Sequence, residues 1–408
     1  MGVFTQYSDT IIKPGLERIK FFLTKLGNPQ NRFITILVGG TNGKGSTVSF
    51  LYSMLRSLGV KVGAYLSPHI HSLEERVLLP EEEKGELKGL LEEMKAKAQG
   101  WGIDLSPFEL LTSAIFVLFS NCELDLAVLE VGLGGRWDAT NVSNPIASVI
   151  VSLGIDHTQY LGSTLASIAR EKLLIARKGI PLVLGDIPVE GLRVLKEGGR
   201  ALGARIHEWQ LDFFVLGEGS EGFCYVGEKV IPSLKLKLEG PHQRVNASLA
   251  LRTMEVLGFS LTPPSLAALQ ETWLPGRMQV ETVDGVPVVF DVAHNPLALK
   301  ALVDGLGRRF GNRPLWAVFK LLKDKPWGEA IKIILEGFER LFFLETPSQD
   351  DREVPKVQLE GSLPLKSVAS KEDWEKVMEE ARKEGAVVVF TGSFRAVREG
   401  LDWLAGRG

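Results

Sequence analysis

A glycine-rich segment that contains one lysine, GTNGKGST at residues 40–47, is the strongest candidate for chemistry in this sequence. It lies between an apolar run at residues 34–38 and a stretch in which apolar residues recur at helical spacing. Glycines let backbone N–H groups turn toward an anion, Lys44 adds positive charge for terminal phosphates, and the first turn of a helix favours negative charge. The alternative, a glycine-rich turn without a ligand, does not explain this order of strand, loop and helix. We therefore predict a nucleotide-binding loop whose contacts come from Asn42, Gly43, Lys44, Gly45, Ser46 and Thr47.

The loop lacks the hydroxyl that usually binds Mg²⁺ beside the phosphates. In the common form of this motif Ser or Thr follows the lysine, whereas this chain has Gly45. Another oxygen then has to help hold the metal, and Ser46 and Ser67 are the candidates. Ser67 begins the triplet SPH, directly after an apolar run at residues 62–66. Alone, this triplet is equally typical of a Ser-Pro turn with a solvated histidine.

Two further strand ends carry residues suited to a metal site. Glu130 lies in the apolar run 124–131, ahead of a glycine-rich loop. A carboxylate buried among apolar residues is costly without a compensating cation or donor, so we expect Glu130 to bind Mg²⁺ or to organise its waters. His157 follows the next run, residues 146–153, at the same expected sheet edge, which favours a ligand over a structural histidine. Lys172, further along the chain, is by residue type more typical of a helix surface.

A second polar set lies in the C-terminal third of the chain. Asp291 and His294 belong to the motif DVAHNP, which follows an apolar strand. Arg277, in the triplet PGR, could clamp a phosphate or a carboxylate because a guanidinium donates in a bidentate fork. The alternatives are a helix-capping signal around Asn295 and an ordinary surface arginine.

Short apolar runs alternate with stretches of helical periodicity, which is the pattern of βαβ units with a mostly parallel sheet. Predicted strands cover residues 34–38, 62–66, 124–131, 146–153, 180–184, 286–291, 315–319, 341–344 and 386–391. In the second half, predicted helices lie near residues 297–309, 327–338, 371–384 and 394–404. We predict an α/β fold with an N-terminal P-loop nucleotide-binding domain at residues 1–273 and a smaller C-terminal Rossmann-like α/β domain at residues 274–408. The turn-rich residues 272–277 are the expected hinge.

The charge, cysteine content and apolar runs of the chain limit the partners and the compartment to be expected. The 408 residues carry a formal charge of only -3, so we expect no nucleic-acid partner. The two cysteines, Cys122 and Cys224, lie far apart and form no CxxC pair, which fits a reducing compartment. The N-terminus lacks the pattern of a signal peptide, and no apolar run is long enough to span a membrane. We therefore expect a cytoplasmic protein without a membrane partner.

Taken in order, the motifs resemble those of the folylpolyglutamate synthase and dihydrofolate synthase family of the Mur ligase superfamily. The resemblance spans nearly the whole chain. It rests on the motifs GLER (15–18), GTNGKGS (40–46), SPH (67–69), SPFE (106–109), EVGLGGRWDATN (130–141), GIDHTQYLG (154–162), EK (171–172), GPHQRVNA (240–247), PGR (275–277) and DVAHNP (291–296). A phosphate loop alone would indicate only a nucleotide-binding protein.

The resemblance implies an ATP-dependent amide ligase with Mg²⁺ as cofactor and small-molecule substrates. ATP phosphorylates a carboxylate of the pterin substrate, and the amine of L-glutamate then attacks the acyl phosphate. Ser67, Glu130 and His157 would hold Mg²⁺, and Lys172 would be carbamylated, which reverses the preference from residue type. The resemblance further places Asn246, Arg277 and Asp291 around ATP and makes Lys44, Lys172 and His294 the catalytic residues. Relatives are usually monomers, so a monomer is expected.

The pterin side of the site is expected at two further motifs, with contacts from Phe108, Glu109, Trp137, Asp138 and Ala139. Trp137 stands where smaller apolar residues are common, and His71 and Glu74 also depart from the family pattern. The sequence therefore leaves open whether dihydropteroate is an acceptor as well as folates. From another class, a P-loop kinase or regulatory ATPase would need no L-glutamate and would not explain the DVAHNP motif.

Overall fold

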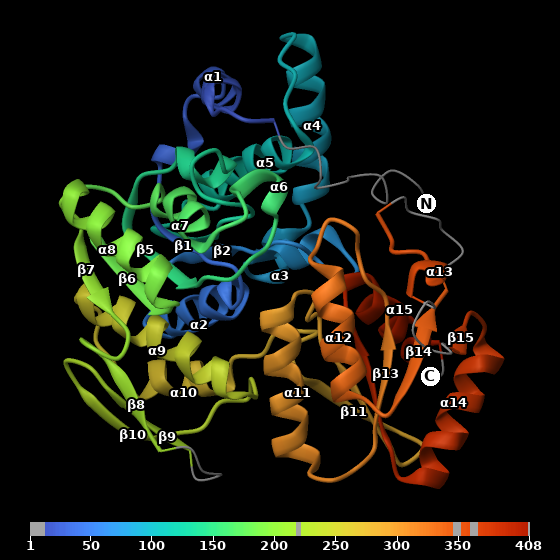
Figure 1. Ribbon diagram of the computed structural model, residues 1–408. Helices are drawn as coiled ribbons and strands as arrows, with labels where there is room; N and C mark the ends of the chain where they lie inside the picture. Colours follow the sequence, from blue (N-terminus) through green and yellow to red (C-terminus); the bar gives the residue numbers. More distant parts are fainter. Residues whose placement is uncertain (1–12, 218–221, 346–351, 360–365, 407–408) are drawn as a thin grey trace. The chain divides into compact units, whose positions relative to one another are not determined.

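The structure is a computed structural model that describes residues 13–217, 222–345, 352–359 and 366–406, apart from the side chains of residues 81 and 357. The chain divides into two compact units (Figure 1). The first contains the residues up to Leu153 together with Leu161–Lys237 and Arg244–Thr272, and the second contains Gly154–Tyr160, Leu238–Gln243 and the residues from Trp273 onward. No helix in the described ranges combines the length and the apolar character that crossing a membrane requires.

The first unit is built on a seven-stranded sheet with the strand order β3-β2-β4-β1-β5-β6-β7. All neighbouring strands are parallel except the short edge strand β3, which is antiparallel to β2. The central strands are apolar along their length and buried, as a sheet covered on both faces requires. The strands are β1 (Ile34–Gly39), β2 (Val62–Tyr65), β3 (Val77–Leu78), β4 (Leu126–Glu130), β5 (Pro145–Ser152), β6 (Pro181–Asp186) and β7 (Arg205–Glu208).

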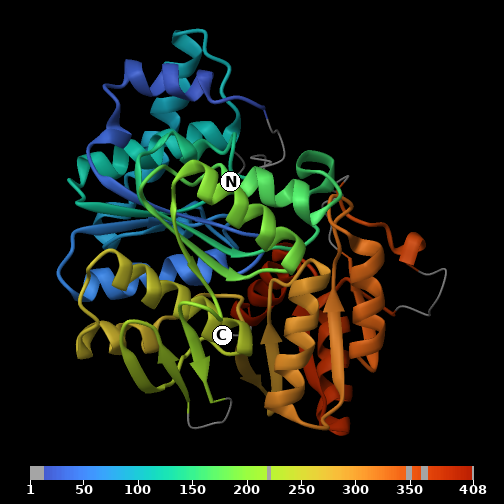
Figure 2. The same ribbon diagram turned by 60° about the vertical axis from the view of Figure 1, so that its left-hand side comes forward.

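Helices cover both faces of this sheet (Figure 2). One face is packed by α1 (Glu17–Lys25), α4 (Leu87–Gly100), α5 (Pro107–Asn121), α7 (Leu165–Leu173) and α8 (Val189–Leu202). The other carries α2 (Lys44–Ser57), α10 (Pro263–Glu271) and α9 (Pro241–Val256) from Arg244 onward. Shorter helical segments of this unit are η1 (Pro29–Asn31), η2 (Leu73–Arg76), α3 (Glu81–Lys84) and η3 (Ala139–Val142), whereas α6 (Thr158–Leu161) groups with the second unit up to Tyr160. A separate antiparallel sheet, which the sequence did not predict, contains β8 (Phe214–Leu216), β9 (Phe223–Val226) and β10 (Val230–Leu234).

The second unit contains a six-stranded sheet with the order β11-β12-β16-β13-β14-β15, parallel except for β11. The strands are β11 (Gln279–Val283), β12 (Val286–Phe290), β13 (Leu315–Phe319), β14 (Arg340–Leu344), β15 (Lys366–Val368) and β16 (Val387–Thr391). One face packs against α11 (Pro296–Phe310) and α12 (Trp327–Gly337), and the other against α14 (Lys371–Glu384) and α15 (Phe394–Ala405). The short helix α13 (Lys356–Leu359) precedes β15. The predicted fold class, two α/β parts with mostly parallel sheets, is confirmed.

Candidate active site

The phosphate loop is a tight turn between β1 and α2. Gly40 and Gly43 have φ values of 145° and 81°, in a region that favours glycine. A Cβ atom on Gly43 would lie 2.4 Å from Oδ1 of Asn246, and one on Gly40 would lie 3.1 Å from the backbone N of Ser152. The helix begins at Lys44, and its N-cap residue is Gly43. The first N–H groups of α2 therefore form the kind of helix terminus that binds phosphate.

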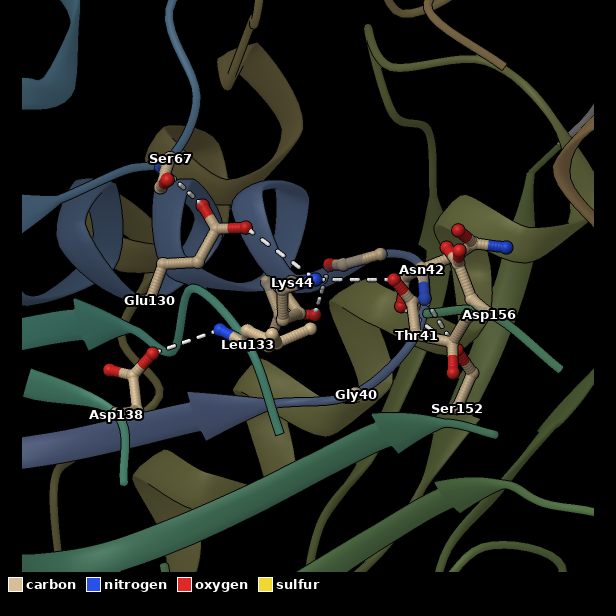
Figure 3. A network of polar contacts seen from close by, with 12 residues as sticks. Gly40, Thr41, Asn42, Lys44, Ser67, Glu130, Leu133, Asp138, Ser152 and Asp156 are labelled. Atoms are coloured by element: carbon tan, nitrogen blue, oxygen red, sulfur yellow. Dashed lines mark hydrogen bonds and ion pairs between the residues drawn. The ribbon is translucent and has the colours of Figure 1, made fainter. Parts of the chain in front are cut away.

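Lys44 and Glu130 face each other across this loop (Figure 3). The Lys44 Nζ atom donates to the Thr41 carbonyl at 3.1 Å and lies 3.9 Å from Oε1 of Glu130. Glu130, at the end of β4, is 5% exposed, and its Oε2 accepts the backbone N–H of Ser67 at 3.0 Å. A cation and a backbone donor thus compensate the buried carboxylate. The side-chain oxygens of Ser67 and Glu130 are ligands of the type that Mg²⁺ prefers, so these two of the predicted metal ligands fit the ion.

Lys172 is buried against the same loop. It is 5% exposed on α7, and its Nζ donates to the Gly40 carbonyl at 2.7 Å. This contact contradicts the surface interpretation that its residue type favoured. The side chain instead reaches the phosphate loop from a helix distant in sequence.

Ser152 is a contact of the phosphate loop that the sequence analysis missed. Its Oγ accepts the N–H of Asn42 at 3.0 Å and donates to the Asn42 carbonyl at 2.9 Å (Figure 3). Its own carbonyl accepts the N–H of Thr41 at 2.9 Å. No local motif marks this serine, because its role depends on the pairing of β5 beside β1.

In the second unit, Asp156 and His157 lie with two residues from the C-terminal part of the chain. The Lys325 Nζ atom is 3.2 Å from both carboxylate oxygens of Asp156 and 2.7 Å from Nε2 of His157. Asn295 donates its side-chain amide to Asp156 Oδ2 at 3.2 Å. Burial alone raises the pKa of Asp156, but the charge of Lys325, joined at acid pH by protonated His157 and His294, outweighs it and holds that pKa well below its usual range. No sequence pattern marked Lys325, which lies outside every motif discussed above.

Asp291, His294 and Arg277 also belong to the second unit. Asp291 follows β12 and accepts the N–H groups of Met278 and Ala293 at 2.8 and 2.9 Å, while burial raises its pKa. His294 hydrogen-bonds the Val292 carbonyl through Nδ1 at 2.8 Å, so Nδ1 carries the proton. Burial, with the nearby charge of Lys325, lowers the pKa of His294 to about 4 and leaves its ring neutral near pH 7. The Arg277 guanidinium lies 5.5 Å from the ring centre of Phe394.

The residues expected at the pterin side fall into two groups: three that are buried or hydrogen-bonded within loops and helix caps, and two aromatic residues. Glu109 is in the capping box of α5 and pairs with Arg18 at 3.3 Å. Asp138 is buried, accepts N–H groups of Leu133 and Thr140 at 2.9 and 3.0 Å, and has a pKa raised by burial. Ala139 is buried at the start of η3.

The aromatic members present ring faces instead. Phe108 stacks on Tyr65 with ring centres 5.9 Å apart, and a Cβ on Gly132 would lie 2.8 Å from it. Trp137 is 48% exposed beneath the guanidinium of Arg136. These two rings are therefore the surfaces in this group suited to contact a flat heterocycle.

Nearly the whole chain is similar to known proteins, in sequence and in structure. Residues 276–394 match the Mur ligase, glutamate ligase domain family. The chain is 31% identical over 409 residues to the dihydrofolate synthase/folylpolyglutamate synthase of Bacillus subtilis, an alignment covering 94% of this chain and 93% of that protein. Its structure is similar to that of E. coli FolC in complex with DHPP and ADP, with a TM-score of 0.87 and 30% identity, covering 98% of this chain and 96% of the other. It is also similar to a bifunctional folylpolyglutamate synthase/dihydrofolate synthase with Mn, AMPPNP and L-glutamate bound, with a TM-score of 0.85, 30% identity and coverages of 98% and 96%.

Proposed function

The chain belongs to the folylpolyglutamate synthase/dihydrofolate synthase family of ATP-dependent ligases, and we propose that it joins L-glutamate to folates and also to dihydropteroate. The observation that carries the proposal is the phosphate loop with Lys44 beside Glu130. The relatives named for both activities support the second acceptor. We assign residues 1–273 to the ATP-binding domain and residues 274–408 to the glutamate-ligase domain.

The reaction has two steps. A carboxylate of the acceptor attacks the terminal phosphorus of ATP, ADP leaves, and the resulting acyl phosphate is attacked by the amine of L-glutamate with loss of phosphate. Carboxylates are poor acylating agents near neutral pH, so phosphate is made the leaving group at the expense of ATP. Because charge on the transferring phosphoryl group must be spread in the transition state, cations and N–H donors provide most of the catalysis.

The phosphate loop supplies those donors in the proposed mechanism. Backbone N–H groups at the start of α2 bind the phosphates, with contacts from Asn42, Gly43, Gly45, Ser46 and Thr47, and Lys44 places its ammonium toward the terminal phosphate. Ser67, Glu130 and His157 would hold Mg²⁺, which neutralises phosphate charge and orients the reacting oxygens when bound. Asn246, Arg277 and Asp291 bind ATP, and neutral His294 lies near the transferring phosphate.

Lys172 is proposed as the carbamylated residue. The unmodified side chain is buried, and its Nζ donates to the Gly40 carbonyl at 2.7 Å, which places the reactive nitrogen beside the phosphate loop. The ammonium first loses a proton, and the neutral amine then forms an N–C bond to CO₂ and releases a second proton, which leaves an anionic carbamate that resembles a carboxylate. Such a group would be a further oxygen ligand of the metal.

Phe108 and Trp137 are proposed to contact the pterin ring, with Glu109, Asp138 and Ala139 holding the loops that present them. We also propose that the enzyme is a cytoplasmic monomer acting on small molecules, with no nucleic acid or membrane as partner. Sedimentation of the purified protein tests the proposed monomeric state.

The decisive experiment measures ADP release by the purified chain with Mg²⁺-ATP and L-glutamate. Parallel reactions contain dihydropteroate, a reduced folate or no acceptor, and products are identified by mass. Glutamate-dependent turnover with both acceptors is expected, while turnover with the folate alone would restrict the enzyme to chain extension. ADP release that ignores glutamate and acceptor would favour an ATPase.

A further inference from the structure

His157 has a backbone conformation that residues with a Cβ atom seldom adopt. Its φ is 51°, in the left-handed region that favours glycine. The residue lies in the segment 154–160, which follows β5 in sequence and groups with the second unit. Such a conformation persists only where surrounding contacts hold it.

Asp156 supplies contacts of that kind. Its Oδ1 accepts the backbone N–H of His157 at 2.8 Å, and its Oδ2 accepts the side-chain amide of Asn295 at 3.2 Å. The Lys325 ammonium lies 3.2 Å from both oxygens. Because Asp156 is 5% exposed, these donors rather than solvent set the orientation of its carboxylate.

The side-chain donors come from the ends of two neighbouring elements. Asn295 is the N-cap of α11, where its Oδ1 accepts the N–H of Ala298 at 3.0 Å, and its amide nitrogen is left to donate to Asp156. Lys325 precedes α12 and approaches Nε2 of His157 at 2.7 Å. An ammonium only donates, so Nε2 accepts this hydrogen bond with the lone pair that a metal would use, and Lys325 has to release that lone pair when a metal binds.

We propose that Asp156, oriented by Asn295 and Lys325, is a positioning residue that fixes the backbone of His157 and thereby presents Nε2 as a metal ligand. The inference rests on the proposed function, since it takes His157 as a ligand of Mg²⁺. It also gives Asn295 a role beyond capping a helix.

The variant Asn295→Asp separates these two roles of Asn295. A carboxylate still accepts the N–H of Ala298, but it turns an oxygen toward Asp156 where the amide donated. The measurement is the dissociation constant of Mn²⁺ for the full chain with AMPPNP, from the EPR signal of free Mn²⁺. We expect affinity to fall by about 10–100-fold, the usual effect of removing groups that orient a metal ligand.

Two further variants serve as comparisons. Thr262→Asp places the same carboxylate at the N-cap of α10 in the first unit, whereas Asp156 belongs to the second, and should keep the parent affinity for Mn²⁺. Asp156→Asn keeps an oxygen for the His157 N–H but loses the charge that holds Lys325, and should also weaken Mn²⁺ binding. The urea midpoint of each variant establishes that the chain is folded under the assay conditions.

The variant His157→Ala distinguishes the inference from the proposed function. If His157 is a ligand, His157→Ala weakens Mn²⁺ binding, and adding Asn295→Asp has no further effect. Weakening by His157→Ala with unchanged affinity in Asn295→Asp and Asp156→Asn would overturn the positioning role and leave the metal site standing. Unchanged affinity in His157→Ala itself would remove both the proposed ligand and the inference.

Discussion

Replacing Gly43 by alanine tests whether the phosphate loop is as tightly fitted as its geometry indicates. Gly43 has a φ of 81°, and an added Cβ would lie 2.4 Å from Oδ1 of Asn246 and 2.8 Å from Cγ1 of Val151. The left-handed conformation costs a residue with a Cβ roughly 1–2 kcal/mol. Overpacking typically adds about 1–3 kcal/mol. Gly43→Ala should therefore lower the free energy of unfolding by about 2–5 kcal/mol.

Gly59, beyond the other end of α2, provides a matched control. Its φ is 80°, and a Cβ there would meet nothing within 4 Å. Gly59→Ala should show only the conformational cost, roughly 1–2 kcal/mol, with an unchanged KM for ATP. Gly43→Ala should also raise the KM for ATP. The increase should be about tenfold for every 1.4 kcal/mol of steric repulsion around the added methyl group that has to be relieved when ATP binds.

The assays are urea unfolding and the dependence of ADP release on ATP concentration. Equal losses of stability in the two variants, together with an unchanged KM for ATP in Gly43→Ala, would refute the close approach of Asn246 and the role of this loop in binding phosphate.

Three further changes test separate parts of the molecule. Lys172→Ala should remove most ligase activity, and short carboxylates such as formate should partly restore it. Near-normal turnover without added carboxylate would contradict the proposed carbamylation of Lys172. Burial, with a smaller effect of Arg277, lowers the pKa of His242 from 6.5 to about 4. The contribution of neutral His242 to the stability of the folded state is therefore complete above pH 6.5 and is lost as the pH falls toward 4. The urea midpoint of His242→Gln should accordingly decline less than that of the parent between pH 7 and pH 4, and parallel declines would contradict this assignment. Glu255→Ala should cost about 3–5 kcal/mol of unfolding free energy, because it removes the buried carboxylate 3.1 Å from the Arg252 guanidinium and leaves the Tyr225 hydroxyl without its acceptor. A loss under about 1 kcal/mol, the usual value for a surface pair, would show that Glu228, 3.0 Å from the same guanidinium, compensates the charge.

The phosphate loop and most of the strands were predictable because their signals are local. Apolar runs between turn residues specify buried parallel strands, and the segments predicted at 315–319 and 371–384 have the bounds of β13 and α14. Glycines that must adopt positive φ mark the loop itself, as Gly40 and Gly43 show. The small sheet of β8, β9 and β10 was missed because its strands are short and partly exposed, and so carry little periodicity.

By itself, the sequence determined the two α/β parts, the phosphate loop and the order of polar residues at strand ends. Only the tertiary structure decided which of these residues touch. Lys172 is a helix lysine by type, yet it reaches the carbonyl of Gly40, 132 residues away. Ser152 meets Asn42 across 110 residues, and Lys325 meets Asp156 across 169. Such contacts depend on the strand order and on which face of a helix is buried, and no periodicity within a single segment encodes either.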